Sequence, residues 1–399
     1  MLRIVQIGPY PLSQDCIQGG VEASVFGLAQ EQSRTSEVHV FDFPRIGGDD
    51  CEEQDGRVKV HRFCNAGKRQ VSTIRQLRAI ATEIGILQPD VCHLHGTGLF
   101  SWLMYRRLKR MGLKVMVTIH GLVLVEKRNM LKKGITPKRV LQYCYQGMVE
   151  KRFLSQLSSA IVDTEYVKEK VKCYPIRRKP VMHVIPQGIN ESYYHIRCSQ
   201  DSRTLLSVGA IGERKGCLLT LKAFERVRQS GIECQLVIVG TIASRSYYEK
   251  IKEAIRKSEF RDDIRLLAEV ADGELKQLYK ASHVFVLHSQ EESQGIAFVE
   301  AMATGMPVVA TKVGGVPCVV ADGVTGLLSE YGDTDAFAEN IKRLLLDFHL
   351  WSCMSDASIR SSETYCWAGI NDRIMALYGS EERIFNAAGS DKLLRVSGN

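Results

Sequence analysis

With 399 residues, of which 45% are hydrophobic, the chain has the length of two or three globular domains and the composition of a protein with a sizeable core. Its net charge of +8 is unevenly spread, since residues 1–200 hold 30 Lys and Arg against 18 Asp and Glu, whereas residues 201–399 hold 23 against 27. There is no leader-like start, no apolar run of transmembrane length and no Cys-x-x-Cys pair among the 12 cysteines, which argues against a secreted, membrane-spanning, zinc-binding or dithiol-redox protein and predicts a cytoplasmic one.

Short apolar runs alternate with longer helical patterns along almost the whole chain, which predicts an α/β protein with parallel sheets. In the first half we expect strands at residues 2–7, 38–43, 58–63, 89–95, 115–119, 160–164 and 181–186. Helices are expected between them at residues 21–32, 72–87, 99–111, 140–157 and 165–171.

The polar stretch 190–202 predicts a linker, after which the strand–helix pattern begins again. In the second half we expect strands at residues 204–208, 235–240, 264–268, 283–288 and 308–310. Helices are expected from about residue 217, at 246–258, 275–282, from 296, and at 334–347 and 366–379. Residues 381–399 carry little pattern and are expected to form a loosely ordered tail.

Residues 101–139 form a strongly basic segment with eleven Lys and Arg and one acid, Glu126. Its apolar residues interleave with its cations. The apolar residues are Trp102, Leu103, Met104 and Leu108, and the cations are Arg106, Arg107, Lys109 and Arg110. A second basic cluster comprises Lys127, Arg128, Lys132, Lys133, Lys138 and Arg139. One interpretation is a solvated basic face, and the other is docking to anionic lipid headgroups or to an anionic acceptor. No nucleic-acid-binding module accompanies the charge, so no nucleic-acid partner is expected.

Three histidines lie on or directly after neighbouring predicted strands. His93 and His95 are two residues apart on one strand and face the same side, so a metal site is geometrically conceivable. No Cys or acidic partner accompanies them, and we expect no metal. His120 directly follows the strand 115–119, and ligands of open α/β sheets gather at the carboxyl ends of strands, which places His120 at a cleft.

The most informative stretch is 291–311, which reads EESQGIAFVEAMATGMPVVAT. A polar loop runs into Gly295, and a helix follows from Ile296, so the first backbone N–H groups of that helix form an anion site around Gly295, Ile296 and Ala297. Glu300 lies one turn into the helix, where its carboxylate can accept hydrogen bonds from a ribose diol. Glu292 lies beyond the phosphates, where a sugar could bind. The alternative for Glu300 is a solvated carboxylate favoured by the helix dipole.

A second candidate site is the turn GAIGERKG at residues 209–216, which joins a predicted strand to a predicted helix. Lys215 is a cation at such a turn in the cleft, and it can neutralise a departing diphosphate. Together the two stretches indicate binding of a nucleotide-diphosphate-sugar: the ribose on Glu300, the phosphates on the helix N-terminus and Lys215, and the sugar near Glu292.

These stretches resemble the family-4 glycosyltransferases of GT-B fold, also described as glycosyl transferases group 1. Glu292 and Glu300 match the Glu-x7-Glu signature, and the match continues through AMATGMPVVATKVGGVPCVVADGVTGLL at residues 301–328. PDVCHLHG at 89–96 and VIPQGIN at 184–190 resemble two further family segments. The resemblance implies two Rossmann-like domains facing across a cleft: an acceptor-binding domain at 1–195, a nucleotide-sugar-binding domain at 200–365, and a crossover helix at 366–380 that packs back on the first.

The resemblance also implies roles for individual residues. His120 contacts the donor sugar, the Gly20 loop faces the donor diphosphate and the acceptor, and Val270 lies in the loop that binds the base. The implied catalytic residues are His120, Lys215 and Glu292. The implied donor-binding residues are Gly20, Gly209, Arg214, Lys215, Val270, Glu292, Gly295, Ile296, Ala297 and Glu300. No cofactor or metal is implied, and transfer with retention of anomeric configuration is expected.

The sequence departs from the family pattern at Ala210, where a second diphosphate-binding Arg is usual. Arg214 can substitute if it reaches the diphosphate; otherwise the chain is a non-catalytic nucleotide-sugar-binding member with a scaffold or regulatory role. Two other GT-B classes, epimerases and glycan phosphorylases, would lack the 292–328 match or require a pyridoxal phosphate Lys. We expect a glycan or lipid-linked acceptor of bacterial polysaccharide or lipid-linked glycan synthesis, and a cytoplasmic enzyme, peripheral at the inner face of the membrane if the basic segment docks there.

Overall fold

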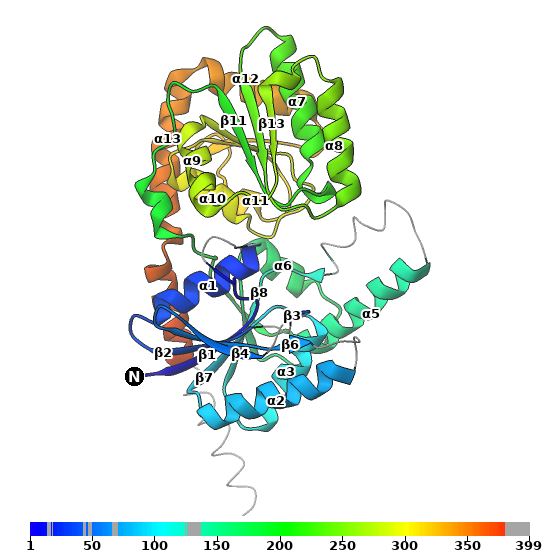
Figure 1. The fold of residues 1–399 in the computed structure, drawn as a ribbon, viewed down its shortest axis with the longest axis vertical. Coiled ribbons are helices and arrows are strands. Elements are labelled where there is room, and N and C mark those ends of the chain that lie inside the picture. The colour runs from blue at the N-terminus through cyan, green and yellow to red at the C-terminus, as the bar shows by residue number, and fades with distance from the viewer. Residues whose placement is uncertain are drawn as a thin grey trace, which may run out of the picture.

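The computed structural model describes residues 1–13, 17, 19–42, 45–46, 50–65, 71–123, 125 and 137–379. Two β-sheets flanked by helices form two units, one above the other in Figure 1. This confirms the α/β class with two Rossmann-like units. The predicted tail 381–399 and the cations Lys127, Arg128, Lys132 and Lys133 lie outside the described residues. No helix among the described residues is both long and apolar enough to cross a bilayer.

The first unit contains an eight-stranded sheet in the order β10-β9-β8-β7-β1-β2-β5-β4. Its strands are β1 (Arg3–Ile7), β2 (Glu37–Phe41), β4 (Cys51–Asp55), β5 (Val58–Arg62), β7 (Val91–His95), β8 (Val115–Ile119), β9 (Ser159–Val162) and β10 (Val181–Val184). All neighbours are parallel except β4, which pairs antiparallel with β5. The sequence did not predict β4, because this mostly exposed edge strand, CEEQD, has no apolar face to signal it.

Helices of the first unit are α1 (Gly20–Gln32), α2 (Val71–Leu87), α3 (Leu99–Arg110), α5 (Pro137–Leu154) and α6 (Glu165–Lys172). Helix α5 begins three residues before its predicted start, because proline is well tolerated in the first turn. In α3 the apolar residues of the basic segment are not all exposed: Met104 and Leu108 are buried in the core, while Arg107 and Arg110 are exposed. The two-residue strands β3 (Arg45–Ile46) and β6 (Cys64–Asn65) form a separate pair.

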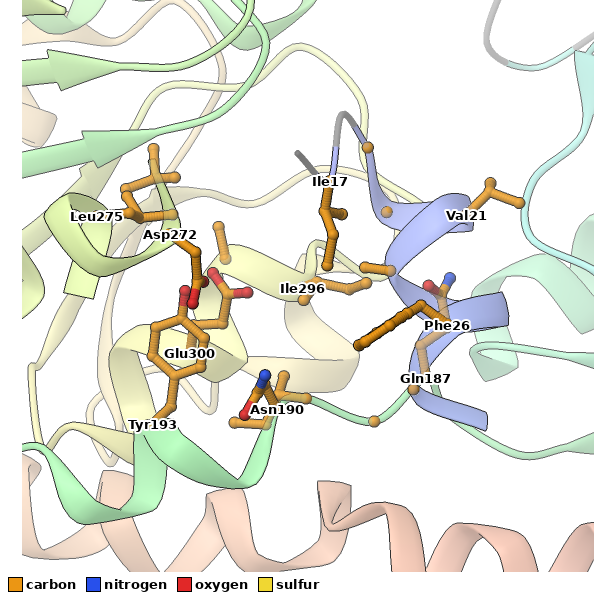
Figure 2. Close-up of a pocket in the computed structure, with 18 of the residues that line it drawn as sticks. Ile17, Val21, Phe26, Gln187, Asn190, Tyr193, Asp272, Leu275, Ile296 and Glu300 are labelled. Carbon is orange, nitrogen blue, oxygen red and sulfur yellow. The ribbon is translucent and has the colours of Figure 1, made fainter. Parts of the chain in front are cut away.

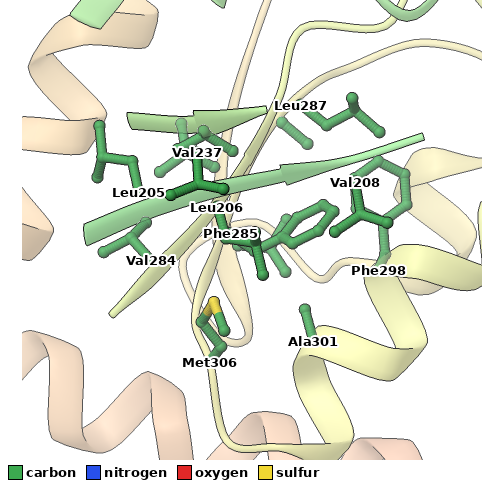
Figure 3. Close-up of a cluster of buried hydrophobic side chains, with 14 of the residues drawn as sticks. Leu205, Leu206, Val208, Val237, Val284, Phe285, Leu287, Phe298, Ala301 and Met306 are labelled. Atoms are coloured by element: carbon green, nitrogen blue, oxygen red, sulfur yellow. The ribbon is translucent and has the colours of Figure 1, made fainter. Parts of the chain in front are cut away.

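The second unit contains a six-stranded, fully parallel sheet in the order β13-β12-β11-β14-β15-β16. Its strands are β11 (Thr204–Val208), β12 (Gln235–Val239), β13 (Ile264–Leu267), β14 (Val284–Leu287), β15 (Val308–Thr311) and β16 (Gly326–Ser329). This is the order of a doubly wound nucleotide-binding sheet, in which ligands bind at the carboxyl ends of the strands where the order reverses. The sheet is buried on both faces, and Figure 3 shows Leu206 and Phe285 on the face that packs against α10.

Helices of the second unit are α7 (Cys217–Gln229), α8 (Arg245–Lys257), α9 (Asp272–Ala281), α10 (Ile296–Ala303), α11 (Val316–Val319), α12 (Thr334–Leu346) and α13 (Phe348–Ser362). The helix α13 was not predicted, although Asp347 caps it by accepting a hydrogen bond from the Leu350 N–H at 2.9 Å. Thr164, Ser244 and Asp333 cap α6, α8 and α12 in the same way.

The predicted linker 190–202 is more structured than its polarity indicated. Residues Glu191–His195 form a 3-10 turn, and within it Tyr193 is buried with its ring edge-on to that of Tyr279. The tyrosine is therefore part of the second unit's core. An aromatic residue in a polar stretch was the available signal for this contact.

Residues 367–379 are helical and descend along the first unit (Figure 1, orange-red). Trp367 packs between Gly27 of α1 and Gly188: a Cβ added to Gly27 would lie 2.2 Å from Trp367 Nε1, and one added to Gly188 would lie 2.6 Å from Cδ2. Tyr378 reaches into the first sheet, where its hydroxyl lies 2.6 Å from His93 Nδ1. The helix 367–379 is thus packed on the first unit.

Candidate active site

A cavity of about 930 Å³ lies between the two units and is lined by residues of both. At one end Tyr193, Asp272 and Glu300 lie together, and at the other end lie Phe26 and Gln187 (Figure 2). The wall includes residues that directly follow strands of both sheets: His120 after β8, Gly209 after β11 and Gly240 after β12. The cavity therefore occupies the place where ligands bind in doubly wound sheets.

Glu292 is held at the centre of this wall in a loop between β14 and α10. The side chain is 3% exposed, and its Oε1 accepts hydrogen bonds from Lys215 Nζ at 2.6 Å and from Ser289 Oγ at 2.7 Å. Burial alone would raise the pKa of the Glu292 carboxyl, but the charges of Lys215 and Arg214 and these hydrogen bonds outweigh it, so the net pKa lies below its usual range. Glu292, which is buried, and Lys215, which is partly exposed, form an ion pair at the cavity wall.

Gly295 makes the turn into α10. Its φ of +83° lies in the left-handed region, and an added Cβ would lie 2.5 Å from Phe298 Cδ2, so a larger residue would be strained and would clash. Because α10 begins at Ile296, its N-terminus opens onto the cavity, where Ile296 and Ala297 form part of the wall. Free N–H groups and the positive end of the helix dipole make this a suitable position for an anion.

Glu300 lies one turn further along α10, half-buried at the cavity wall. Its Oε2 accepts a hydrogen bond of 2.8 Å from the hydroxyl of Tyr279. Burial raises the pKa of the Glu300 carboxyl to about 7, with Asp272 adding to the effect and Tyr279 and Lys276 opposing it. The carboxylate is thus a cavity-facing acceptor rather than a fully solvated residue.

Lys215 is the last residue of a 3-10 turn, Glu213–Lys215, between β11 and α7. Its aliphatic chain lies over Gly209, where an added Cβ would be 3.2 Å from Lys215 Cε. Gly216 follows with a φ of +64°, and an added Cβ there would lie 2.0 Å from the carbonyl oxygen of His288. Ala210, at the position where the family Arg is absent, and Arg214 both line the cavity.

His120 lines the cavity but turns its ring nitrogens toward other protein groups. Nε2 lies 2.9 Å from His95 Nδ1, and Nδ1 lies 3.4 Å from Asp163 Oδ2. His95 Nε2 in turn contacts Gln6 Oε1 at 2.7 Å, and burial holds the pKa of His95 well below its usual range. Nε2 of His120 is therefore part of a buried polar network, whereas Nδ1 is a buried nitrogen that has no hydrogen-bond partner among the described residues.

The predicted pair His93 and His95 stacks face to face with ring centroids 4.5 Å apart. His93 is hydrogen-bonded to Tyr378 and to Thr118, and burial lowers its pKa to about 3. The described part of the chain contains no group of three or more His, Cys, Asp or Glu side chains arranged to hold a metal ion. In the structure these two histidines are core groups that stack on each other, and each is hydrogen-bonded to neighbouring side chains: His93 to Tyr378 and Thr118, His95 to His120 and Gln6.

All the residues that the sequence placed at the site lie on the wall of this one cavity: Gly20, His120, Gly209, Arg214, Lys215, Val270, Glu292, Gly295, Ile296, Ala297 and Glu300. Sequence reasoning missed Tyr193, Asp272 and Gln294, which share the wall. Gln294 stands within the quoted motif, but nothing in one sequence separates a polar loop residue that faces a cavity from one that faces solvent.

A two-unit α/β architecture with a cleft at the carboxyl ends of both sheets defines a protein of GT-B type. Residues 196–356 match the family described as "Glycosyl transferases group 1", and residues 18–193 match "Glycosyltransferase Family 4". The chain belongs to these glycosyltransferases.

Relatives of known name agree with this assignment. The chain is 25% identical to the D-inositol 3-phosphate glycosyltransferase of Corynebacterium diphtheriae, with 98% of this chain and 99% of that protein covered. It is 31% identical to the lipopolysaccharide 1,2-N-acetylglucosaminetransferase of Salmonella typhimurium, with 45% and 48% covered.

Solved structures share the fold. Sucrose-phosphate synthase from Thermosynechococcus elongatus superposes with a TM-score of 0.80 at 20% identity, covering 97% of this chain and 100% of that one. The Anabaena protein Alr3699/HepE in complex with UDP-glucose has a TM-score of 0.74 at 16% identity, covering 95% and 100%.

Proposed function

We propose that this glycosyltransferase moves a sugar from a nucleotide-diphosphate-sugar to an acceptor hydroxyl, with retention of anomeric configuration. The observation that carries the proposal is the ion pair between Lys215 Nζ and the buried Glu292 Oε1, 2.6 Å apart, on a cavity wall that also includes the N-terminus of α10. A cation and a helix N-terminus suit a diphosphate, and a carboxylate beside them suits the hydroxyls of a sugar.

The donor would lie along this wall. Glu300 would accept hydrogen bonds from the ribose, and the diphosphate would lie over the N–H groups of Gly295, Ile296 and Ala297. Lys215 would then divide its hydrogen bonds between Glu292 and the diphosphate. The sugar would lie near Glu292, on the side of the cavity that the first unit closes.

In the reaction, the bond from the anomeric carbon to the phosphate oxygen breaks, and its electron pair leaves with the diphosphate, which Lys215 stabilises. The acceptor oxygen forms the new bond to the same carbon. Its proton passes to the departing phosphate oxygen, which gains negative charge as the bond to the anomeric carbon breaks. Closure of the two units over the donor would limit hydrolysis by water.

Arg214 is proposed as the second diphosphate-binding cation, in place of the Arg that the family pattern has at position 210. Both positions line the cavity, and the backbone oxygen of Arg214 is fixed by a 2.7 Å hydrogen bond from the Gln290 N–H. If Arg214 serves this role, Arg214→Ala lowers kcat and Ala210→Arg raises it at most severalfold. A large gain of turnover from Ala210→Arg would instead favour the alternative of a catalytically weak, nucleotide-sugar-binding protein.

The donor is proposed to be a UDP-sugar, because the Anabaena neighbour was solved in complex with UDP-glucose. The acceptor is proposed to be a phosphorylated polyol or a lipid-linked glycan, because the two relatives are named for D-inositol 3-phosphate and for lipopolysaccharide. A thermal-shift screen with UDP, GDP and ADP and their sugars tests the donor class. A ligand that binds only the folded protein stabilises it by mass action and so raises its melting temperature. At a ligand concentration a hundred times the dissociation constant, the gain in free energy of unfolding is about 2.7 kcal/mol. The absence of a shift with all of them would contradict the proposal.

The proposal extends to peripheral contact with an anionic membrane, which would bring a lipid-linked acceptor to the first unit. On α5, Leu141, Tyr145 and Met148 are 73%, 46% and 49% exposed and share one face by their spacing. The adjacent α3 carries the exposed cations Arg107 and Arg110. Exposed apolar side chains beside cations are typical of helices that bind anionic bilayers.

Vesicle sedimentation tests this contact. We expect binding to vesicles with phosphatidylserine or phosphatidylglycerol at low salt, weaker binding at high salt, and weaker binding by Leu141→Asp. Equal binding to purely zwitterionic vesicles, or none at low salt, would contradict a charge-dependent contact.

A further inference from the structure

The loop Glu291–Gln294 lies between β14 and α10 and contains Glu292. Hydrogen bonds join this loop to the first unit on both sides of Glu292. We propose that Thr164, Tyr166 and Gln187 of the first unit are positioning residues for transfer, because they hold the loop on which the second unit presents Glu292. The inference rests on the proposed function of Glu292. Of the three residues, Thr164 and Tyr166 do not line the cavity, whereas Gln187 does.

Thr164 holds the loop on the carboxyl side of Glu292. Its hydroxyl donates a hydrogen bond of 2.9 Å to the carbonyl oxygen of Ser293 and accepts one of 3.4 Å from the Val167 N–H as the N-cap of α6. Gly315 makes this approach feasible, since an added Cβ there would lie 1.8 Å from the Ser293 oxygen and 3.2 Å from Thr164 Oγ1. One side chain therefore both caps a helix of the first unit and binds the loop of the second.

Tyr166 holds the residue before Glu292. Its hydroxyl donates a hydrogen bond of 2.8 Å to Glu291 Oε1. Burial and the neighbouring Glu291 carboxylate raise the pKa of the Tyr166 phenol above its usual value, so the phenol remains a donor throughout the neutral range. Neither Tyr166 nor Glu291 is among the described residues that line the cavity, so neither is placed to touch a donor there.

Gln187 holds the end of the loop through a reciprocal pair of hydrogen bonds. Its backbone N–H donates to Gln294 Oε1 at 2.8 Å, and Gln294 Nε2 donates to the Gln187 carbonyl oxygen at 2.9 Å. Both residues are buried. A paired amide of this kind fixes both the position and the orientation of the Gln294 side chain relative to the first unit.

Glu292 itself is held by the second unit. Lys215 and Ser289 donate to its carboxylate, and the Gly315 N–H donates to its carbonyl oxygen at 2.8 Å. The second unit thus orients the carboxylate, and the first unit fixes the residues beside it. Displacing a catalytic group by about 1 Å can reduce turnover about a hundredfold, so losing one of these anchors should cost part of that.

The experiment compares Tyr166→Phe and Thr164→Val with wild type, using Thr164→Ser as the conservative rescue and Tyr248→Phe as the matched control. Tyr248 lies on α8 of the second unit and is not among the residues lining the cavity. Three quantities are measured on the full chain: kcat and donor KM with a UDP-sugar, and hydrogen exchange of the backbone amides at 289–298 by mass spectrometry.

We expect Tyr166→Phe and Thr164→Val to lower kcat by about threefold to thirtyfold with donor KM changed less than twofold, and to accelerate exchange at 289–298. Thr164→Ser and Tyr248→Phe should match wild type in both. Unchanged kcat would overturn the inference whether or not exchange is faster, and so would a rise in donor KM without a fall in kcat. A wild-type chain that transfers no sugar would overturn the proposed function. Independently of that result, unchanged exchange at 289–298 in Tyr166→Phe and Thr164→Val would show that the hydrogen bonds of Tyr166 and Thr164 do not hold the loop.

Discussion

At the scale of single residues, two glutamates on one cavity wall have opposite electrostatic surroundings. Glu292 is paired with Lys215, and the charges of Lys215 and Arg214 bring its pKa below the usual range despite burial. At Glu300 burial prevails and raises the pKa to about 7, because Tyr279 and Lys276 compensate only in part. One carboxylate is therefore charged throughout the neutral range, while the other gains its charge within that range.

This difference predicts a pH-dependent donor affinity that originates at Glu300. As pH falls through about 7, Glu300 takes up a proton and loses the charged acceptor proposed for the ribose. Donor KM should therefore rise severalfold between pH 8 and pH 6 in wild type, and the rise should be smaller in Glu300→Gln. An equally steep rise in Glu300→Gln would assign the effect to another group.

The same pKa has a consequence for stability. A carboxyl whose pKa is higher in the folded protein favours folding when protonated, so wild-type stability should fall as pH rises from about 4.5 to about 7. Relative to wild type, Glu300→Gln should gain roughly 1–3 kcal/mol between pH 4.5 and pH 8. Denaturant unfolding of both proteins at the two pH values measures this, and an unchanged difference would show that burial does not raise this pKa.

At the scale of elements, glycines let segments approach closely around the site. Gly314 has a φ of +54°, and an added Cβ would lie 2.1 Å from the backbone carbonyl oxygen of Glu292. Gly27 on α1 and Gly188 after β10 admit the indole of Trp367, which joins the C-terminal helix 367–379 to the first unit. The repeated glycines of the sequence pattern are thus explained by backbone approach as well as by turns.

The contact of Gly27 with Trp367 yields a matched pair of variants. Gly27→Ala should cost about 2–4 kcal/mol of unfolding free energy, because its Cβ would lie 2.2 Å from Trp367 Nε1 and one of the two helices must move. Gly369→Ala lies on the same C-terminal helix, where nothing stands within 4 Å of an added Cβ, and should be neutral or stabilising by up to about 1 kcal/mol. Equal stability of the two variants would show that the indole does not pack against α1.

At the scale of the whole molecule, much of the architecture could be predicted from the sequence, because buried parallel strands are apolar runs and their helices have a clear period. The edge strand β4 could not be predicted, because it lacks an apolar face. The helix α13 could not be predicted either, because only Asp347 separates it from α12 and no loop signals a second helix. Residues of the cavity wall could be predicted because several follow strands and turns and others match the family motifs. Contacts across the units, such as those of Thr164 and Tyr166, could not, because the residues they join are more than a hundred positions apart in the chain.

The central claim is that the cleft between the units transfers a sugar through Lys215 and Glu292. The most direct measurement uses NMR to monitor product formation by wild type, Lys215→Ala and Glu292→Gln. The donor is a UDP-sugar that raises the melting temperature of the protein. We expect a product with the anomeric configuration of the donor from wild type, and turnover reduced by at least about a hundredfold in both variants while they remain folded. Wild-type turnover in either variant, or a product of inverted configuration, would contradict the account.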